Sequence, residues 1–237
     1  MSAESGETSF KVERVAIERT VRLVASARLR DPVLLQLVQA SQLADLAEIE
    51  GATSGRLMHK ARGGERLGAD ELVAGLPHAT FVNAAFTYWR PRELNRFNAP
   101  GRGAWYAALD TATCVAEVSF HMIRELERVN DLRATVEYAE MFASFAGDFA
   151  DLRELRPKPD CLHPDPAIGY PAGNRLADTA RGRGLNGVVY PSVRHPVGTC
   201  LVALWPAVVQ SVTQGSVLRL VWSGSRTPTV SLLAQTA

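Results

Sequence analysis

The order in which apolar runs and helical periodicity follow one another constrains this fold more than any other feature of the sequence. Three apolar runs near the C-terminal end, at residues 187–190, 200–205 and 217–222, are typical of buried strands. Earlier in the chain, alternation over residues 20–25 and an aromatic- and Ala-rich segment at 103–109 predict two more strands. Helical and strand segments do not alternate regularly, as they would in a doubly wound parallel sheet. The pattern therefore predicts an α+β domain.

The clearest single element is a helix from about residue 112 to residue 129. Its apolar residues recur at helical spacing, at Val115, Val118, Met122, Leu126 and Val129. Asp110 or Thr111 can cap its first turn, because a side-chain oxygen there accepts a backbone N–H. Further helices are expected between Asp31-Pro32 and Gly51, at residues 69–74 and at residues 174–183.

Three other segments have weaker patterns. Aromatic, Val and Ala residues at 81–89 predict a strand. Residues 135–145 fit either a strand or a helix. Residues 156–172 are broken by Pro157, Pro159, Pro164, Pro166 and Pro171, so that a surface loop is expected there.

The domain organisation follows from what the sequence lacks. No internal repeat, low-complexity stretch or long polar linker divides the 237 residues, and 46% of them are hydrophobic, enough for one sizeable core. We therefore expect a flexible N-terminus at residues 1–12 and a single domain at residues 13–237.

Charge and hydropathy exclude several classes of function. Lys and Arg number 26 and Asp and Glu number 25, so no net positive charge marks the chain as a direct binder of nucleic acid or of an anionic membrane. The first residues lack the basic and apolar regions of a signal peptide, and no apolar run approaches the roughly 18 residues of a membrane span. A cytoplasmic protein is expected.

Common catalytic signatures are also missing. The sequence has no Walker or dinucleotide-type Gly-rich loop, no His-Glu-x-x-His and no Gly-x-Ser-x-Gly elbow. Its three cysteines are scattered and are expected to be reduced. Cys161-x-His163 offers two ligands in a proline-rich segment, fewer than the four of a structural zinc site, so no metal site is expected.

Five residues that matter below have an ordinary explanation when each is taken alone. Spacing places Glu117 on a solvated helix face, away from the apolar stripe. Arg22 lies inside a short apolar strand, where it either faces solvent or is held to meet an anion. Ser192 ends a strand, where a serine often satisfies the backbone of a turn. Arg96 would be an exposed loop residue, and Tyr106 would pack in the core with its hydroxyl tied to a neighbour.

Taken in order, the segments around these residues resemble the RES-domain family, which is named for an arginine, a glutamate and a serine far apart in the chain. The similar segments are the strand 20–24, the Asn-Arg-Phe turn 95–97 with the tyrosine strand 103–108, the glutamate helix 113–121 and the serine segment 187–194. They span about residues 20 to 205. The segment 46–57 resembles an extra helical element of a longer subgroup.

The resemblance implies a fold related to ADP-ribosyltransferases, with a mixed-sheet core and flanking helices. It also implies an enzyme that degrades NAD⁺ by phosphorolysis or hydrolysis of the bond between nicotinamide and ribose. NAD⁺ would then be a substrate and inorganic phosphate a possible co-substrate, with no permanently bound cofactor. Phosphorolysis and hydrolysis remain alternatives at this point.

The residue types suit that reaction. Arg22 and Arg96 would offer planar, permanently charged groups to the diphosphate. Glu117 would stabilise the positive charge that develops on the ribose when neutral nicotinamide leaves. Tyr106 would stack against a ring, and Ser192 would hydrogen-bond the ribose or a phosphate. Ser192 is not expected to be a nucleophile, because no adjacent base is visible in the sequence.

The resemblance implies a partner as well. Such toxins belong to toxin–antitoxin pairs, and the antitoxin is a helix-turn-helix protein of the Xre-like class that covers the active site. A homo-oligomer is also possible. Two other functions stay open: a protein ADP-ribosyltransferase that uses the same NAD⁺ pocket, and a catalytically silent interaction module.

Overall fold

The computed structural model describes residues 10–26, 67–87 and 94–233. Within these ranges, no helix combines the length and the apolar character needed to cross a membrane. The expected helix between Asp31-Pro32 and Gly51, and the segment 46–57, lie outside the described residues.

A seven-stranded mixed sheet forms the centre of the molecule, in the order β1-β2-β5-β4-β3-β6-β7. Its strands are β1 (Lys11–Ala25), β2 (Trp105–Ala108), β3 (Arg133–Asp151), β4 (Gly187–Pro191), β5 (Thr199–Ala203), β6 (Gln210–Ser223) and β7 (Thr229–Leu232). Only β3 and β4 pair in parallel; the other pairs of described strands are antiparallel. The mixed sheet with flanking helices confirms the predicted α+β class.

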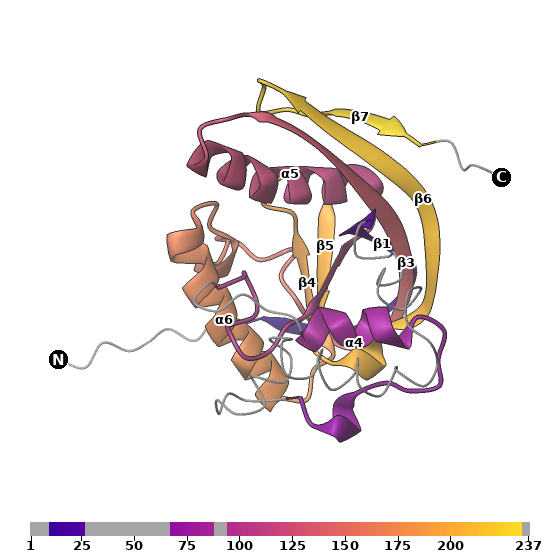
Figure 1. Cartoon of the computed structure of the whole chain (residues 1–237). Helices are drawn as coiled ribbons and strands as arrows, with labels where there is room; N and C mark the ends of the chain where they lie inside the picture. The colour runs from indigo at the N-terminus through magenta and orange to yellow at the C-terminus, as the bar shows by residue number, and fades with distance from the viewer. Residues whose placement is uncertain (1–9, 27–66, 88–93, 234–237) are drawn as a thin grey trace.

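The sheet bends back on itself because β1 has two partners. It pairs with β3 along most of its length and with β2 at Val21, opposite Ala108. Strands β2, β5 and β4 then lead back to β3, so that five strands close a ring of pairings. Figure 1 shows β3 and β6 as long curved strands with helix α5 lying inside their curve. Strand β1 begins at Lys11, two residues before the expected start of the domain.

Helix α5 (Thr111–Arg128) confirms the clearest sequence prediction. Its N-cap is Asp110, whose carboxylate accepts a hydrogen bond from the Thr113 N–H at 2.7 Å. The far end of the helix buries Leu126 against the outer part of the sheet, in a cluster with Tyr138, Leu218, Leu220 and Trp222. The apolar residues that recur at helical spacing lie on the side of the helix that makes this contact.

Helix α6 (Pro166–Gly182) starts eight residues before the predicted helix, inside the segment that was expected to be a loop. That prediction was right for the short 3-10 turn η5 (Asp160–Leu162) and its surroundings, but wrong from Pro166 onward. Pro166 occupies the first helical position, where no N–H is needed, and Asp165 caps the turn by accepting from the Ala167 N–H at 2.9 Å. Burial of the helix then outweighs the interior Pro171.

Helix α4 (Ala79–Thr87) replaces the strand predicted for residues 81–89. Val82 and Phe86 are its buried residues, and a spacing of four places them on one helical face. Asn83 also fixes the helix, since its side-chain amide exchanges two hydrogen bonds with the backbone of Val73. The helix expected at 69–74 is only the 3-10 turn η4 (Ala69–Glu71). The undecided segment 135–145 belongs to strand β3.

The core lies on both faces of the central strands. Alternate side chains of β4 and β5, such as Val188 and Val202, pack toward α6, whereas Val189 and Leu201 pack toward α4 and the 3-10 turn η6 (Pro206–Val208). Strands covered on both faces have apolar residues at every position, and this explains the apolar runs of the sequence.

Candidate active site

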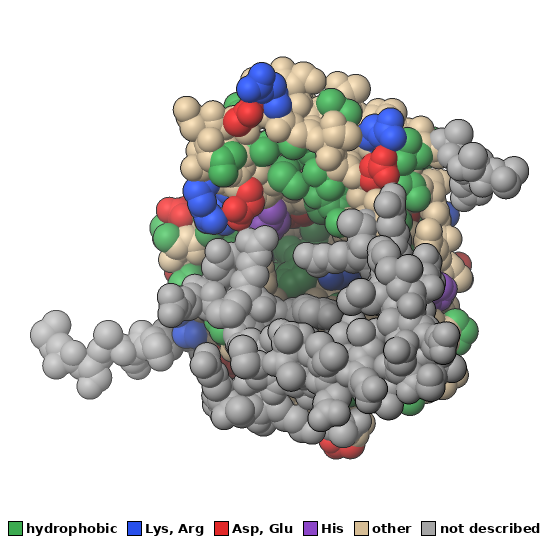
Figure 2. Space-filling view, viewed as in Figure 1, with side chains coloured by type: hydrophobic (Ala, Val, Ile, Leu, Met, Phe, Trp, Pro, Cys, Tyr) green, Lys and Arg blue, Asp and Glu red, His purple; other side chains and the backbone are tan. Residues whose placement is uncertain are grey.

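A cavity of about 230 Å³ opens between α5, α6 and the strands of the ring. On the face drawn in Figure 2, apolar side chains lie above and inside a hollow below α5, with a histidine at its margin and a basic side chain within it. The lining residues include four of the five singled out from the sequence: Arg22, Arg96, Tyr106 and Glu117. Ser192, the fifth, hydrogen-bonds Glu117. The structure therefore brings together residues that lie far apart in the chain.

Glu117 and Ser192 form the central contact of the site. The Ser192 hydroxyl donates to Glu117 Oε1 at 2.7 Å, and Ser192 is only 6% exposed. Ser192 Oγ also accepts hydrogen bonds from the backbone N–H groups of Arg194 at 3.2 Å and His195 at 3.0 Å. A serine hydroxyl has one proton and two lone pairs, so all of its capacity is used. Ser192 therefore hydrogen-bonds the backbone of its own turn and orients Glu117, rather than presenting a free group to a ligand.

The prediction from spacing that Glu117 lies on a solvated helix face is wrong. Glu117 is half-buried on the cavity wall, because α5 has a second packed side besides the one that buries Leu126. That second side includes Cys114, which belongs to the core cluster formed with α6. A single apolar stripe in the sequence does not reveal a helix that is covered on two sides.

The turn after β4 is attached to the first turn of α5. His195 Nδ1 lies 2.9 Å from Thr113 Oγ1, which donates to Asp110 Oδ2 at 2.7 Å. Since the threonine proton is used, the histidine nitrogen is the donor in its contact. Burial alone would raise the pKa of Asp110, but the hydrogen bonds from Thr113 lower it below its usual value. Sequence reasoning missed His195 and Thr113, whose contact depends on a close approach of the two segments.

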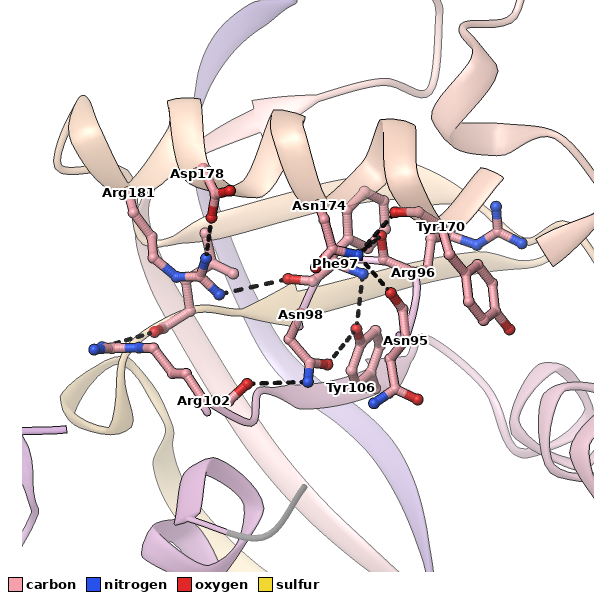
Figure 3. A network of polar contacts seen from close by, with 11 residues as sticks. Asn95, Arg96, Phe97, Asn98, Arg102, Tyr106, Tyr170, Asn174, Asp178 and Arg181 are labelled. Atoms are coloured by element: carbon pink, nitrogen blue, oxygen red, sulfur yellow. Dashed lines mark hydrogen bonds and ion pairs between the residues drawn. The ribbon is translucent and has the colours of Figure 1, made fainter. Parts of the chain in front are cut away.

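The turn that carries Arg96 is held by its own side chains (Figure 3). Arg96 is 8% exposed, and its Nη1 donates to the carbonyls of Cys161 at 2.6 Å and His163 at 3.1 Å. The expectation from sequence that Arg96 is an exposed loop residue is therefore wrong. The Tyr106 hydroxyl accepts from the Phe97 N–H at 2.9 Å and donates to an asparagine of the same turn. Its expected tie to a neighbour is confirmed, and its burial raises its pKa.

Helix α6 packs directly on this turn, as Figure 3 shows. Asn174 Nδ2 donates to the carbonyl of Asn95 at 2.7 Å. A Cβ at Gly173 would lie 2.0 Å from the Arg96 carbonyl oxygen, and one at Gly169 would lie 2.8 Å from Arg96 Nη1. The two glycines therefore allow helix and turn to touch, and they fix the wall of the cavity next to Arg96.

Arg22 reaches the cavity from strand β1. Its Nη1 donates to the Tyr106 carbonyl at 3.1 Å, and its Cζ lies 4.9 Å from the centre of the Trp105 ring. Of the two sequence interpretations, the solvent-facing one is wrong: Arg22 is half-buried and held in place.

Thiols and aromatic rings that the sequence did not single out complete the lining: Cys114, Cys200, Tyr170 and Tyr190. Burial raises the pKa of Cys114 to about 12 and raises that of Cys200 further. Both thiols are therefore protonated near neutral pH and are poor nucleophiles. Within the described ranges, no three His, Cys, Asp or Glu side chains are grouped as a metal site requires. The arrangement presents one carboxylate and fixed arginines in a cavity that tyrosine rings, thiols, Asn95 and His121 also line.

Comparisons with known proteins show the family of the chain. A family model described as RES domain matches residues 72–223. The match includes Arg96, Tyr106, Glu117 and Ser192, and leaves Arg22 outside. No curated protein matches the sequence. Among solved structures, a chain in the crystal structure of the M. tuberculosis MbcT–MbcA toxin–antitoxin complex is similar, at 16% identity and a TM-score of 0.35. The alignment covers 51% of this chain and 71% of that chain.

Proposed function

The chain belongs to the RES-domain family, and we propose that it is a cytoplasmic NAD⁺-degrading enzyme and the toxin of a toxin–antitoxin pair. The observation that carries the proposal is the carboxylate of Glu117, which Ser192 orients at the half-buried wall of a cavity that two arginines also line. A fixed negative charge in such surroundings acts most strongly on a positive charge that develops next to it.

The reaction requires such a charge. The bond between ribose C1′ and the nicotinamide nitrogen breaks, and its electron pair neutralises the nicotinamide ring. The ribose carries the positive charge through an oxocarbenium-like transition state. An oxygen of water or of inorganic phosphate then bonds to C1′, and an attacking water loses a proton. Glu117 stabilises the ribose cation and needs no covalent bond to the substrate for this role.

The size of the cavity indicates which end of NAD⁺ enters it. At about 230 Å³ it is smaller than the roughly 300–1,000 Å³ of pockets that enclose a drug-sized ligand. We assign it to the nicotinamide and its ribose, with the rest of the dinucleotide extending outward. Tyr106 and Tyr170 present rings on which nicotinamide would stack. Arg22 and Arg96 supply positive charge toward the diphosphate, although Nη1 of each also holds the backbone of the site.

Incubation of purified protein with NAD⁺, with and without phosphate, tests the proposal. Nicotinamide should be released, with ADP-ribose as the second product if water attacks and its 1″-phosphate if phosphate attacks. Label transferred to a protein acceptor would instead identify an ADP-ribosyltransferase.

Glu117→Gln should abolish nicotinamide release without unfolding the protein, because the amide oxygen can still accept from Ser192. Glu125→Gln is the matched control on the same helix, since Glu125 forms an exposed pair with Arg128. Unchanged turnover by a folded Glu117→Gln protein would remove this mechanism.

The proposal includes a protein partner. A helix-turn-helix antitoxin of the Xre-like class would cover the cavity, and the near-neutral charge of this chain is compatible with DNA contact through that partner.

A further inference from the structure

Arg194 extends from the same turn that orients Glu117. Its backbone N–H donates to Ser192 Oγ, the atom whose proton goes to Glu117. Its side chain then crosses to α5, where Cζ lies 3.3 Å from the centre of the Phe120 ring. Phe120 follows Glu117 by three residues and is therefore its neighbour along the helix. The guanidinium thus lies one helical turn from the carboxylate.

The same side chain reaches the segment that precedes α6. Arg194 Nη2 donates to the Pro164 carbonyl at 2.7 Å. Arg194 therefore spans the space between α5 and α6, the two helices that contribute Glu117 and Tyr170 to the cavity. Arg194 does not itself line the cavity, but Arg96, Glu117 and Tyr170, which do, are close enough to act on its charge.

The hydrogen bonds and charges around Arg194 are incomplete. Its Nε is shielded from solvent and has no hydrogen-bond partner in the described part of the chain. Burial lowers the pKa of Arg194, and the positive charge of Arg96 lowers it further, whereas Glu117 and Tyr170 act in the opposite direction. No ion pair joins either arginine to a carboxylate among the described residues.

A bound anion would satisfy the deficit in charge. Two nearby cations repel each other until a negative group lies between them. The planar guanidinium matches phosphate oxygens through two parallel hydrogen bonds. Because Phe120 covers one face of the group and Nε is shielded, the Nη groups are the side on which a ligand can be bound.

We propose that Arg194 binds a phosphate of the NAD⁺ diphosphate beside the cavity, while Glu117 acts on the ribose inside it. This assignment rests on the proposed function. It gives Arg194 a substrate-binding role that the sequence did not suggest, and Arg96, whose Nη1 holds the cavity wall, adds its charge near the same phosphate. The turn that carries Ser192 and Arg194 then sets the distance between the phosphate contact and the Glu117 carboxylate.

The test compares substrates with and without phosphate. Arg194→Gln should raise the KM for NAD⁺ by about 10- to 100-fold, the range for one lost charge-assisted hydrogen bond. Cleavage of nicotinamide riboside, which has the same scissile bond but no phosphate, should change less than about threefold. Arg194→Lys, which keeps the charge but not the planar fork, should be intermediate. The Kd of ADP-ribose, measured by calorimetry, should rise in parallel with the KM for NAD⁺.

Arg124→Gln is the matched control. Arg124 also faces the Phe120 ring, at 5.8 Å, but it is exposed, and its loss should leave both substrates unaffected. Equal losses on NAD⁺ and the riboside, or an unchanged Kd for ADP-ribose in folded Arg194→Gln, would overturn the assignment. If wild-type cleavage of the riboside is too slow to measure, the Kd of ADP-ribose decides alone. A wild-type protein that neither binds ADP-ribose nor cleaves NAD⁺ would contradict the proposed function itself.

Discussion

Replacement of Gly173 by alanine tests how closely α6 must approach the turn that carries Arg96. Gly173 is buried in the middle of the helix, and an added Cβ would lie 2.0 Å from the Arg96 carbonyl oxygen, where ordinary contacts are 3.4–4 Å. The obstacle is backbone, which cannot rotate away as a side chain can. Moving the contact from 2.0 Å to 3.4 Å requires helix and turn to separate by about 1.4 Å.

The expected cost follows from that displacement. Overpacking of a close contact costs about 1–3 kcal/mol, and the better helix propensity of alanine offsets at most about 1 kcal/mol. We expect Gly173→Ala to lower the free energy of unfolding by about 1–3 kcal/mol. At roughly 2–4 °C per kcal/mol for a chain of this size, the melting temperature should fall by about 3–10 °C. NAD⁺ turnover should fall as well, because Arg96 and Tyr170 line the cavity on the two sides of this contact.

Urea denaturation and thermal melting measure the loss, and Gly182→Ala is the control. Gly182 is the last residue of the same helix, and no atom lies within 4 Å of a Cβ added there. The same substitution should therefore be neutral or should stabilise by up to about 0.5 kcal/mol. Equal stabilities of the Gly173→Ala and Gly182→Ala proteins would refute the argument that this contact fixes the cavity wall.

Two further predictions concern the site and its partner. Ser192→Ala should lower kcat more than it changes KM, and should cost about 1–3 kcal/mol of stability, because it releases Glu117 and leaves two partly buried N–H groups unpaired. Wild-type kcat in the folded variant would contradict the orienting role. Addition of the helix-turn-helix partner should reduce NAD⁺ turnover in proportion to the complex formed, and turnover should recover when the complex is disrupted. A stoichiometric complex that retains the free-enzyme rate would exclude occlusion of the cavity.

Local signals in the sequence predicted part of the fold well. Helix α5 was predictable because an N-cap aspartate, Asp110, precedes a regular apolar period. The central strands were predictable because burial on both faces makes them continuously apolar. Helix α4 was not, since Phe81, Val82 and Phe86 are types that favour strands, and only their packing selects a helix. The same holds for α6, whose burial outweighs Pro171.

In the site, as in the fold, contacts between distant segments could not be predicted from local sequence. The resemblance singled out five residues, and the structure brings them together, but spacing alone placed Glu117 in solvent. The saturated hydroxyl of Ser192 depends on N–H groups of the following turn, and no residue type reveals that geometry. Arg194 follows the serine by two residues, but its contacts with Phe120 and Pro164 arise only when the turn after β4, α5 and the segment before α6 meet.

The closed ring of strands has a consequence for the order in which the chain matures. Strand β1 finds its partner β3 only across about half of the chain, and the ring is completed only when β4 and β5 have been added. Contacts between such distant segments form slowly, because a long loop must close before any pairing is gained. A nascent chain on the ribosome that still lacks β5 has Arg22 and Glu117 but not the wall that encloses them. On the proposed function, NAD⁺ consumption would therefore begin only after almost the whole chain has been synthesised, and this delay gives a partner protein time to bind first.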